Sequence, residues 1–144
     1  MDNATHVRTW LLACPPIADS TGLFGSDYLQ DEPGGFTLDS VPSALKYVEN
    51  IEGEMRLQPR QEQLFVLAAR MDYGAEASAN LNNLGVFREI FDWIIGRDNA
   101  RDLPAWEGGA LTAIVPTLTA YPIAVGSSAA RYQIQIKALY KVEG

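Results

Sequence analysis

The sequence predicts an α+β fold: a mostly antiparallel sheet of four to five strands with two helices packed on one face. Three observations lead to this prediction. Residues 130–142 alternate between apolar and polar side chains, and residues 80–95 carry apolar side chains at helical spacing. The order along the chain is helix, three or four strands, helix, two strands. At this length, residues 1–144 are expected to form one domain.

The first third of the chain is expected to contain a helix and two short strands. Residues 3–14 have the apolar spacing of a short helix, which Pro15-Pro16 is expected to end. A brief strand is expected from Tyr28-Leu29, before a turn at residues 31–35. Residues 36–41 then alternate as a second strand.

A hairpin is predicted in the middle of the chain, with residues 46–57 pairing with residues 61–71 around Gln58-Pro-Arg60. The first arm alternates only weakly, with Gly53 as a possible bulge. The second arm contains the run Leu64–Ala69, which is apolar on both faces and typical of a strand buried on two sides.

The main helix is expected to begin near Ser78 or Asn80, to run to about Ile95 and to stop at Gly96. Its predicted apolar stripe consists of Leu81, Leu84, Phe87, Phe91, Ile94 and Ile95. Arg88 and Asp92 lie one turn apart on the polar side. Residues 99–109 show no period and predict a long exposed loop that contains Trp106.

Two strands are predicted to close the chain. Residues 111–121 form the first, with Pro116 marking an edge or a bulge, and residues 124–129 form the turn. The final strand, residues 130–144, is expected between two neighbours, with its Tyr and Ile face against the main helix. Its other face bears Gln133, Gln135 and Lys137, which are expected to meet water or another subunit.

Charge and cysteine content disfavour several classes of protein. The net charge is −7 and the Lys and Arg residues are scattered, so neither a nucleic-acid binder nor a membrane-surface protein is expected. Cys14 is the single cysteine, which excludes an intrachain disulfide and is expected to be a buried thiol. The N-terminus does not resemble a signal peptide, and no apolar run is long enough to predict a membrane span.

Motifs for catalysis or cofactor binding are absent from the sequence. His6 is the only histidine, so a zinc site of ordinary ligands and a Ser-His-Asp triad are both disfavoured. Neither a P-loop nor a dinucleotide-binding glycine motif occurs. Carboxylates are plentiful, but nothing selects one pair for glycoside hydrolysis. We therefore expect no cofactor, no metal and no enzymatic activity.

Four segments resemble, in order and spacing, a family of small bacteriophage proteins described as minor capsid or tail-terminator-like. The segments are DYLQDEPGGFTLDSVP (residues 27–42), QLFVLAARMDYG (63–74), NLNNLGVFREIFDWI (80–94) and ARYQIQIKALY (130–140). The resemblance extends over about residues 27–142. It is weakest at residues 51–60 and 99–109.

This resemblance implies an α+β subunit of the neck or tail of a long-tailed phage. Such proteins cap the tail tube as a ring, commonly a hexamer, and join it to the head connector protein. The expected location is the virion, and the host cytoplasm during assembly. DNA would pass through the ring without specific binding, which agrees with the acidic net charge. Trp106, Gln133, Gln135 and Lys137 are the residues expected to meet a neighbouring subunit or partner.

Two alternatives remain at this point. The first is a head-completion or connector subunit of the phage neck that never contacts the tail tube. The second, from a different class, is a small ligand-binding domain or enzyme with an acidic cleft. Close carboxylates in a deep pocket would favour the second alternative.

Overall fold

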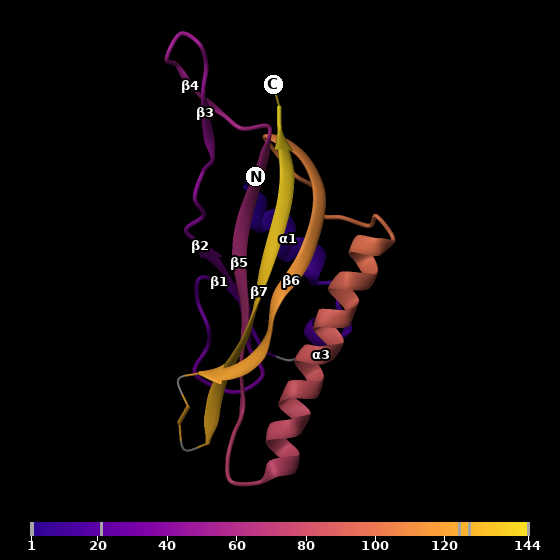
Figure 1. The fold of residues 1–144 in the computed structure, drawn as a ribbon. Coiled ribbons are helices and arrows are strands. Elements are labelled where there is room, and N and C mark those ends of the chain that lie inside the picture. The colour runs from indigo at the N-terminus through magenta and orange to yellow at the C-terminus, as the bar shows by residue number, and fades with distance from the viewer. Residues whose placement is uncertain (1, 21, 124, 127, 144) are drawn as a thin grey trace.

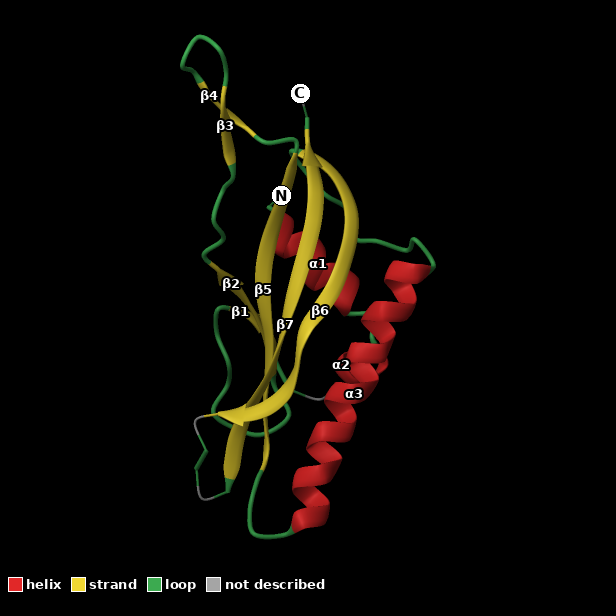
Figure 2. Cartoon of the chain, in the orientation of Figure 1, coloured by secondary structure: helices red, strands yellow, loops and turns green. Residues whose placement is uncertain are grey.

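A computed structural model describes residues 2–20, 22–123, 125–126 and 128–143. The elements are α1 (Asn3–Leu11), α2 (Pro15–Ala18), β1 (Phe24–Ser26), β2 (Phe36–Val41), β3 (Tyr47–Glu49), β4 (Met55–Leu57), β5 (Arg60–Asp72), α3 (Ala77–Asn99), β6 (Gly109–Ile123) and β7 (Ala129–Val142). Figure 1 and Figure 2 show a long, twisted sheet with α1 behind it and α3 along one side. Ala124 and Ser127 of the predicted turn at residues 124–129 lie outside the described residues.

The predicted α+β class is confirmed, with a five-stranded sheet in the order β1-β2-β5-β7-β6. The sheet is mixed, because β1 pairs with β2 in parallel while the other neighbours pair antiparallel. The terminal strand β7 lies between β5 and β6 and pairs with both along its length, as its clean alternation predicts. The edge position of β6 accommodates Pro116, next to which the register shifts.

One face of the sheet forms the core together with buried side chains of the helices. On β7 this face carries Tyr132, Ile134 and Ile136, all of which are buried. The Phe87 ring of α3 stacks on Tyr132 with 6.4 Å between ring centroids. Buried residues of α1 and α2, including Leu11 and Ile17, belong to the same cluster. The structure thus contains a third, short helix beyond the two that were predicted, and α2 begins at Pro15, since proline is tolerated in the first helical turn.

The predicted hairpin between residues 46–57 and 61–71 is wrong. Residues 47–57 instead form a hairpin of their own, in which β3 pairs with β4. The second predicted arm, β5, pairs with β2 on one side and β7 on the other. The physical reason is that β5 is apolar on both faces and is stabilised at the sheet centre, whereas the weakly alternating residues 47–57 are not.

The predicted apolar stripe of α3 is too wide. Leu81, Leu84 and Ile95 are exposed, and the buried positions are Phe87, Ile90 and Ile94. The helix also begins earlier, at Ala77 after Glu76, and runs past Gly96 to Asn99. Its face against the sheet is therefore narrower than its apolar composition indicates. Gly96 does not end the helix, although glycine in a helix interior costs about 1 kcal/mol relative to alanine.

The short strand expected at Tyr28-Leu29 lies slightly earlier in the chain, at β1. The cause is the parallel register Phe24↔Phe36, which places Phe24 in the core. Tyr28 follows the strand and is exposed, and its backbone N–H donates to Thr37 Oγ1 at 3.1 Å. A short apolar pair such as Tyr28-Leu29 does not by itself locate a strand.

Cys14 provides a test of the core. The thiol is buried, and burial raises its pKa to about 12, with a further contribution from Glu89. Because the thiolate is the reactive form, iodoacetamide at pH 8 should modify Cys14 in the folded protein at least about 100-fold more slowly than in guanidinium chloride. Equal rates in both solutions, measured by mass spectrometry, would contradict this burial.

Candidate functional site

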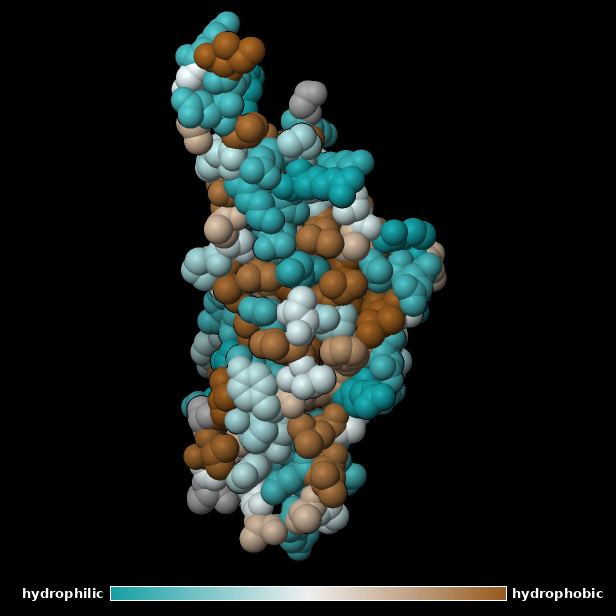
Figure 3. All heavy atoms as spheres, viewed as in Figure 1, coloured by the Kyte–Doolittle hydropathy of each residue, from teal (hydrophilic) through white to brown (hydrophobic). Residues whose placement is uncertain are grey.

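The sheet face opposite the core, here called the open face, is viewed from the front in Figure 3. On β5 it carries Leu64 and Val66, and on β7 it carries Arg131, Gln133, Gln135 and Lys137. Apolar and hydrophilic side chains lie intermingled on it (Figure 3). A mixture of apolar and polar side chains is common in protein interfaces, so this face is a candidate contact surface.

The three predicted β7 residues of the open face lie in a row and bind neighbouring strands. Gln133 Nε2 donates to the Tyr121 hydroxyl at 3.3 Å, and Gln135 Oε1 accepts from Thr117 Oγ1 at 3.0 Å. Lys137 Nζ lies 3.6 Å from Glu62 Oε2. These contacts hold the side chains in place across β5, β6 and β7, so the open face presents an ordered polar row.

Arg131 extends this row to β2. Its Nη2 lies 2.6 Å from Asp39 Oδ2, and its Nε donates to Gln133 Oε1 at 3.2 Å. Thr37 Oγ1 in turn donates to Asp39 Oδ1 at 2.8 Å. The alternation of β7 puts Arg131 on the same face as Gln133, but its pairing with Asp39 depends on the order of the strands.

Trp106 lies apart from the open-face row and packs on its own chain. Its ring is 5.2 Å from the ring of Tyr140, and the side chain is partly buried against the core. The surrounding loop is held to α1, because Asn3 and Glu107 exchange two hydrogen bonds and Trp10 Nε1 donates to Asp102 O. These contacts favour a role for Trp106 in anchoring the loop to its own domain, and its role as a partner contact stays a prediction.

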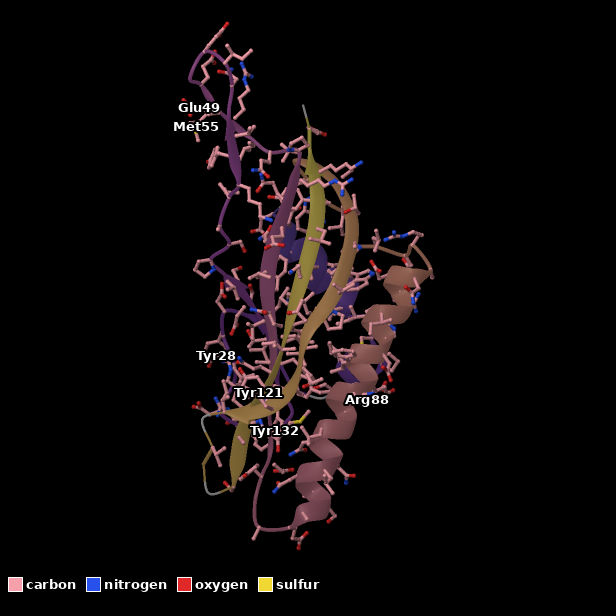
Figure 4. All side chains as sticks on the ribbon, viewed as in Figure 1. Tyr28, Glu49, Met55, Arg88, Tyr121 and Tyr132 are labelled. Carbon is pink, nitrogen blue, oxygen red and sulfur yellow. The ribbon has the colours of Figure 1, made fainter. Side chains whose placement is uncertain are left out.

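The most exposed element is the hairpin of β3 and β4, here called the arm (residues 45–58). It projects beyond the end of the sheet (Figure 1), and Glu49 and Met55 pair on it clear of the remaining chain (Figure 4). Its exposed large apolar residues are Leu45, Tyr47, Val48, Ile51, Met55 and Leu57, and Ile51 at the tip is 105% exposed. An isolated two-stranded hairpin is marginally stable in water. The arm is therefore a strong candidate for a contact with another chain.

Local hydrogen bonds define both ends of the arm. At the tip, Asn50 Oδ1 accepts from the backbone N–H groups of Glu52 and Glu54 at 3.0 and 2.9 Å, and Gly53 takes φ +84°. At the root, the buried Gln61 accepts from Lys46 N at 3.0 Å and donates to Lys46 O at 2.7 Å and Gln58 O at 3.0 Å. The root contacts direct the arm outward.

A hollow of about 470 Å³ lies where the arm joins the sheet. Its lining residues are Lys46, Arg60, Gln61, Glu62, Thr112, Leu139, Tyr140 and Lys141. We call it the basic hollow, because three of these side chains are cationic and one is a carboxylate. It does not correspond to the acidic cleft considered as an alternative. Sequence inspection missed it, since Lys46, Arg60 and Lys141 are far apart in the chain.

The one histidine weighed for catalysis lies beside the loop at residues 99–109. His6 Nε2 is buried 3.8 Å from Glu107 Oε1. Within residues 2–20, 22–123, 125–126 and 128–143, no group of three His, Cys, Asp or Glu side chains is placed to hold a metal ion. Over the same part of the chain, no helix has the length and apolar character needed to cross a membrane.

Comparison with known proteins gives no assignment. Neither the protein-family models nor the curated proteins that were searched contain a match to this chain.

Proposed function

We propose that this chain is a structural subunit of the neck or tail of a long-tailed bacteriophage, which assembles into a ring that caps the tail tube and meets the head connector. A hexamer is favoured. The ordered sequence resemblance over residues 27–142 supports the phage role. The acidic net charge of −7 suits a ring through which DNA passes without binding.

The observation that carries the assembly role is the arm. It exposes six large apolar side chains on a hairpin that contributes no residue to the core cluster. Apolar surface of this kind is favourable to bury and is uncommon on a protein that acts alone. A projecting arm meets a different part of its neighbour, and such heterologous contacts close into rings when the rotation between copies closes.

The solution mass of the purified protein is the first test. Light scattering over a concentration series should detect a closed species near six times the chain mass of 15.8 kDa. Gln133, Gln135 and Lys137 on the open face are proposed as further contacts in that species. A single monomeric mass at every concentration would contradict spontaneous ring formation.

Deletion of the gene separates a tail terminator from a connector subunit. Overlong tail tubes in the absence of the protein would favour the tail terminator.

A further inference from the structure

Three cations line the basic hollow: Lys46, Arg60 and Lys141. Of the eleven Lys and Arg residues, six form ion pairs, and Arg8 and Arg70 donate to the backbone oxygens of Phe24 and Gln30. The remaining three are Lys46, Arg60 and Lys141, and all three line this hollow. Among the described residues, no ion pair or side-chain hydrogen bond joins these three cations to a partner.

The strand register makes this cluster unfavourable by itself. Arg60 of β5 lies directly opposite Lys141 of β7, and like charges in opposed positions destabilise a sheet. Glu62, the one carboxylate of the hollow, already lies against Lys137. An anionic group entering the hollow would remove this repulsion. Clustered cations on a chain of net charge −7 therefore indicate a binding site for an acidic ligand.

The tip of the arm has the complementary chemistry. Glu49, Glu52 and Glu54 lie within six residues and flank the fully exposed Ile51. Glu54 contacts Arg56 at 3.4 Å, and no ion pair occupies Glu49 or Glu52 among the described residues. The lining of the hollow also includes Leu139 and Tyr140, which suits an apolar side chain surrounded by carboxylates.

We propose that the basic hollow of one copy receives the arm tip of a second copy. The tip cannot reach the hollow of its own chain, because the arm projects away from its root (Figure 4) and Gln61 holds that root in place. The contact is heterologous, so each copy gives one tip and receives another. This inference rests on the proposed ring and names its subunit contact. The overall charge of −7 disfavours nucleic acid as the occupant.

Charge reversal by pairs of substitutions tests this contact. The first variant reverses the tip with Glu49→Lys and Glu52→Lys, and the second reverses the hollow with Arg60→Glu and Lys141→Glu. All four side chains are exposed, so both variants should fold, which circular dichroism and thermal unfolding would check. Each variant alone pairs like charges and should self-associate at least about tenfold more weakly than the original protein by light scattering.

An equimolar mixture of the two variants should recover the original association. In the mixture, the basic tip of one variant faces the acidic hollow of the other, and the unaltered tip and hollow also match. Recovery should weaken as salt rises, because screening reduces attraction between exposed charges. A ring that persists unchanged in both single variants, or no recovery on mixing, would overturn the contact and leave the ring proposal standing.

Thiol cross-linking decides the contact even if the original protein is a monomer. Copies with Ile51→Cys, mixed with copies carrying Lys141→Cys, should be joined by a short bismaleimide. In the matched control mixture, copies with Ile51→Cys are mixed with copies carrying Leu81→Cys, at an exposed position on α3. Cys14 is buried and should not react. Cross-linking in the first mixture alone would support the contact, and in that case a monomeric mass by light scattering would contradict only the spontaneous ring. Equal cross-linking in both mixtures, or none, would overturn it.

Discussion

Replacing Phe87 by alanine is expected to lower the free energy of unfolding by about 3–5 kcal/mol. Phe87 is buried and stacks on Tyr132, and its ring also lies 6.4 Å from that of Phe36. Removal leaves a cavity where α3 meets β2 and β7, which the surrounding rings cannot fill without leaving their rotamers. Urea unfolding followed by circular dichroism measures the change.

Leu81 supplies the matched control on the same helix. It is 64% exposed, so Leu81→Ala should change the free energy of unfolding by no more than about 0.5 kcal/mol. The two substitutions also decide which part of the predicted apolar stripe meets the sheet. Similar losses for Leu81 and Phe87 would contradict the observed orientation of α3.

Replacing Gln61 by alanine is expected to cost about 2–3 kcal/mol and to release the arm. Gln61 is 2% exposed, and its amide makes three hydrogen bonds to the backbone of Lys46 and Gln58. The substitution removes three part-buried hydrogen bonds, each of which contributes about 1 kcal/mol, and leaves the Lys46 backbone N–H without its side-chain partner. Hydrogen exchange should become faster at residues 45–58.

Gln63 is the control for Gln61. It lies two residues along β5, is half-buried, and has no side-chain hydrogen bond among the described residues. Gln63→Ala should therefore change the free energy of unfolding by no more than about 0.5 kcal/mol. It should leave the hydrogen-exchange rates of the arm unchanged. Unchanged exchange in the Gln61 variant would show that the arm keeps its direction by other means.

A mobile arm in the Gln61 variant should also weaken self-association, because ordering the arm on binding costs conformational entropy.

The elements that the sequence predicts well have patterns that local chemistry decides. Residues 36–41 form β2 at the predicted bounds, and the alternation from residue 130 onward forms β7 with its Tyr and Ile face buried. In β7, a period of two places every second side chain in the core. In β2, Thr37 is buried as well as Phe36 and Leu38, so three successive side chains are buried there. The ion pair of Arg88 and Asp92 likewise follows from one-turn spacing.

The candidate sites are less accessible to sequence reasoning. Gln133, Gln135 and Lys137 were assigned to one face correctly, but their partners come from β5 and β6 and depend on strand order. Trp106 has no period around it, so only its contact with Tyr140 reveals that it packs on its own chain. The arm was mistaken for half of a larger hairpin, because weak alternation does not identify the partner of a strand.

Composition and periodicity are enough to predict the α+β class and the terminal strand with its buried face. The strand pairing reveals two further features: residues 47–57 project as a separate hairpin, and Lys46, Arg60 and Lys141 converge at its base. The physical reason is that side-chain periodicity is a local property, whereas strand pairing is chosen by burial across the whole sheet. The β5–β7 register places Arg60 opposite Lys141, although 80 positions separate them along the chain.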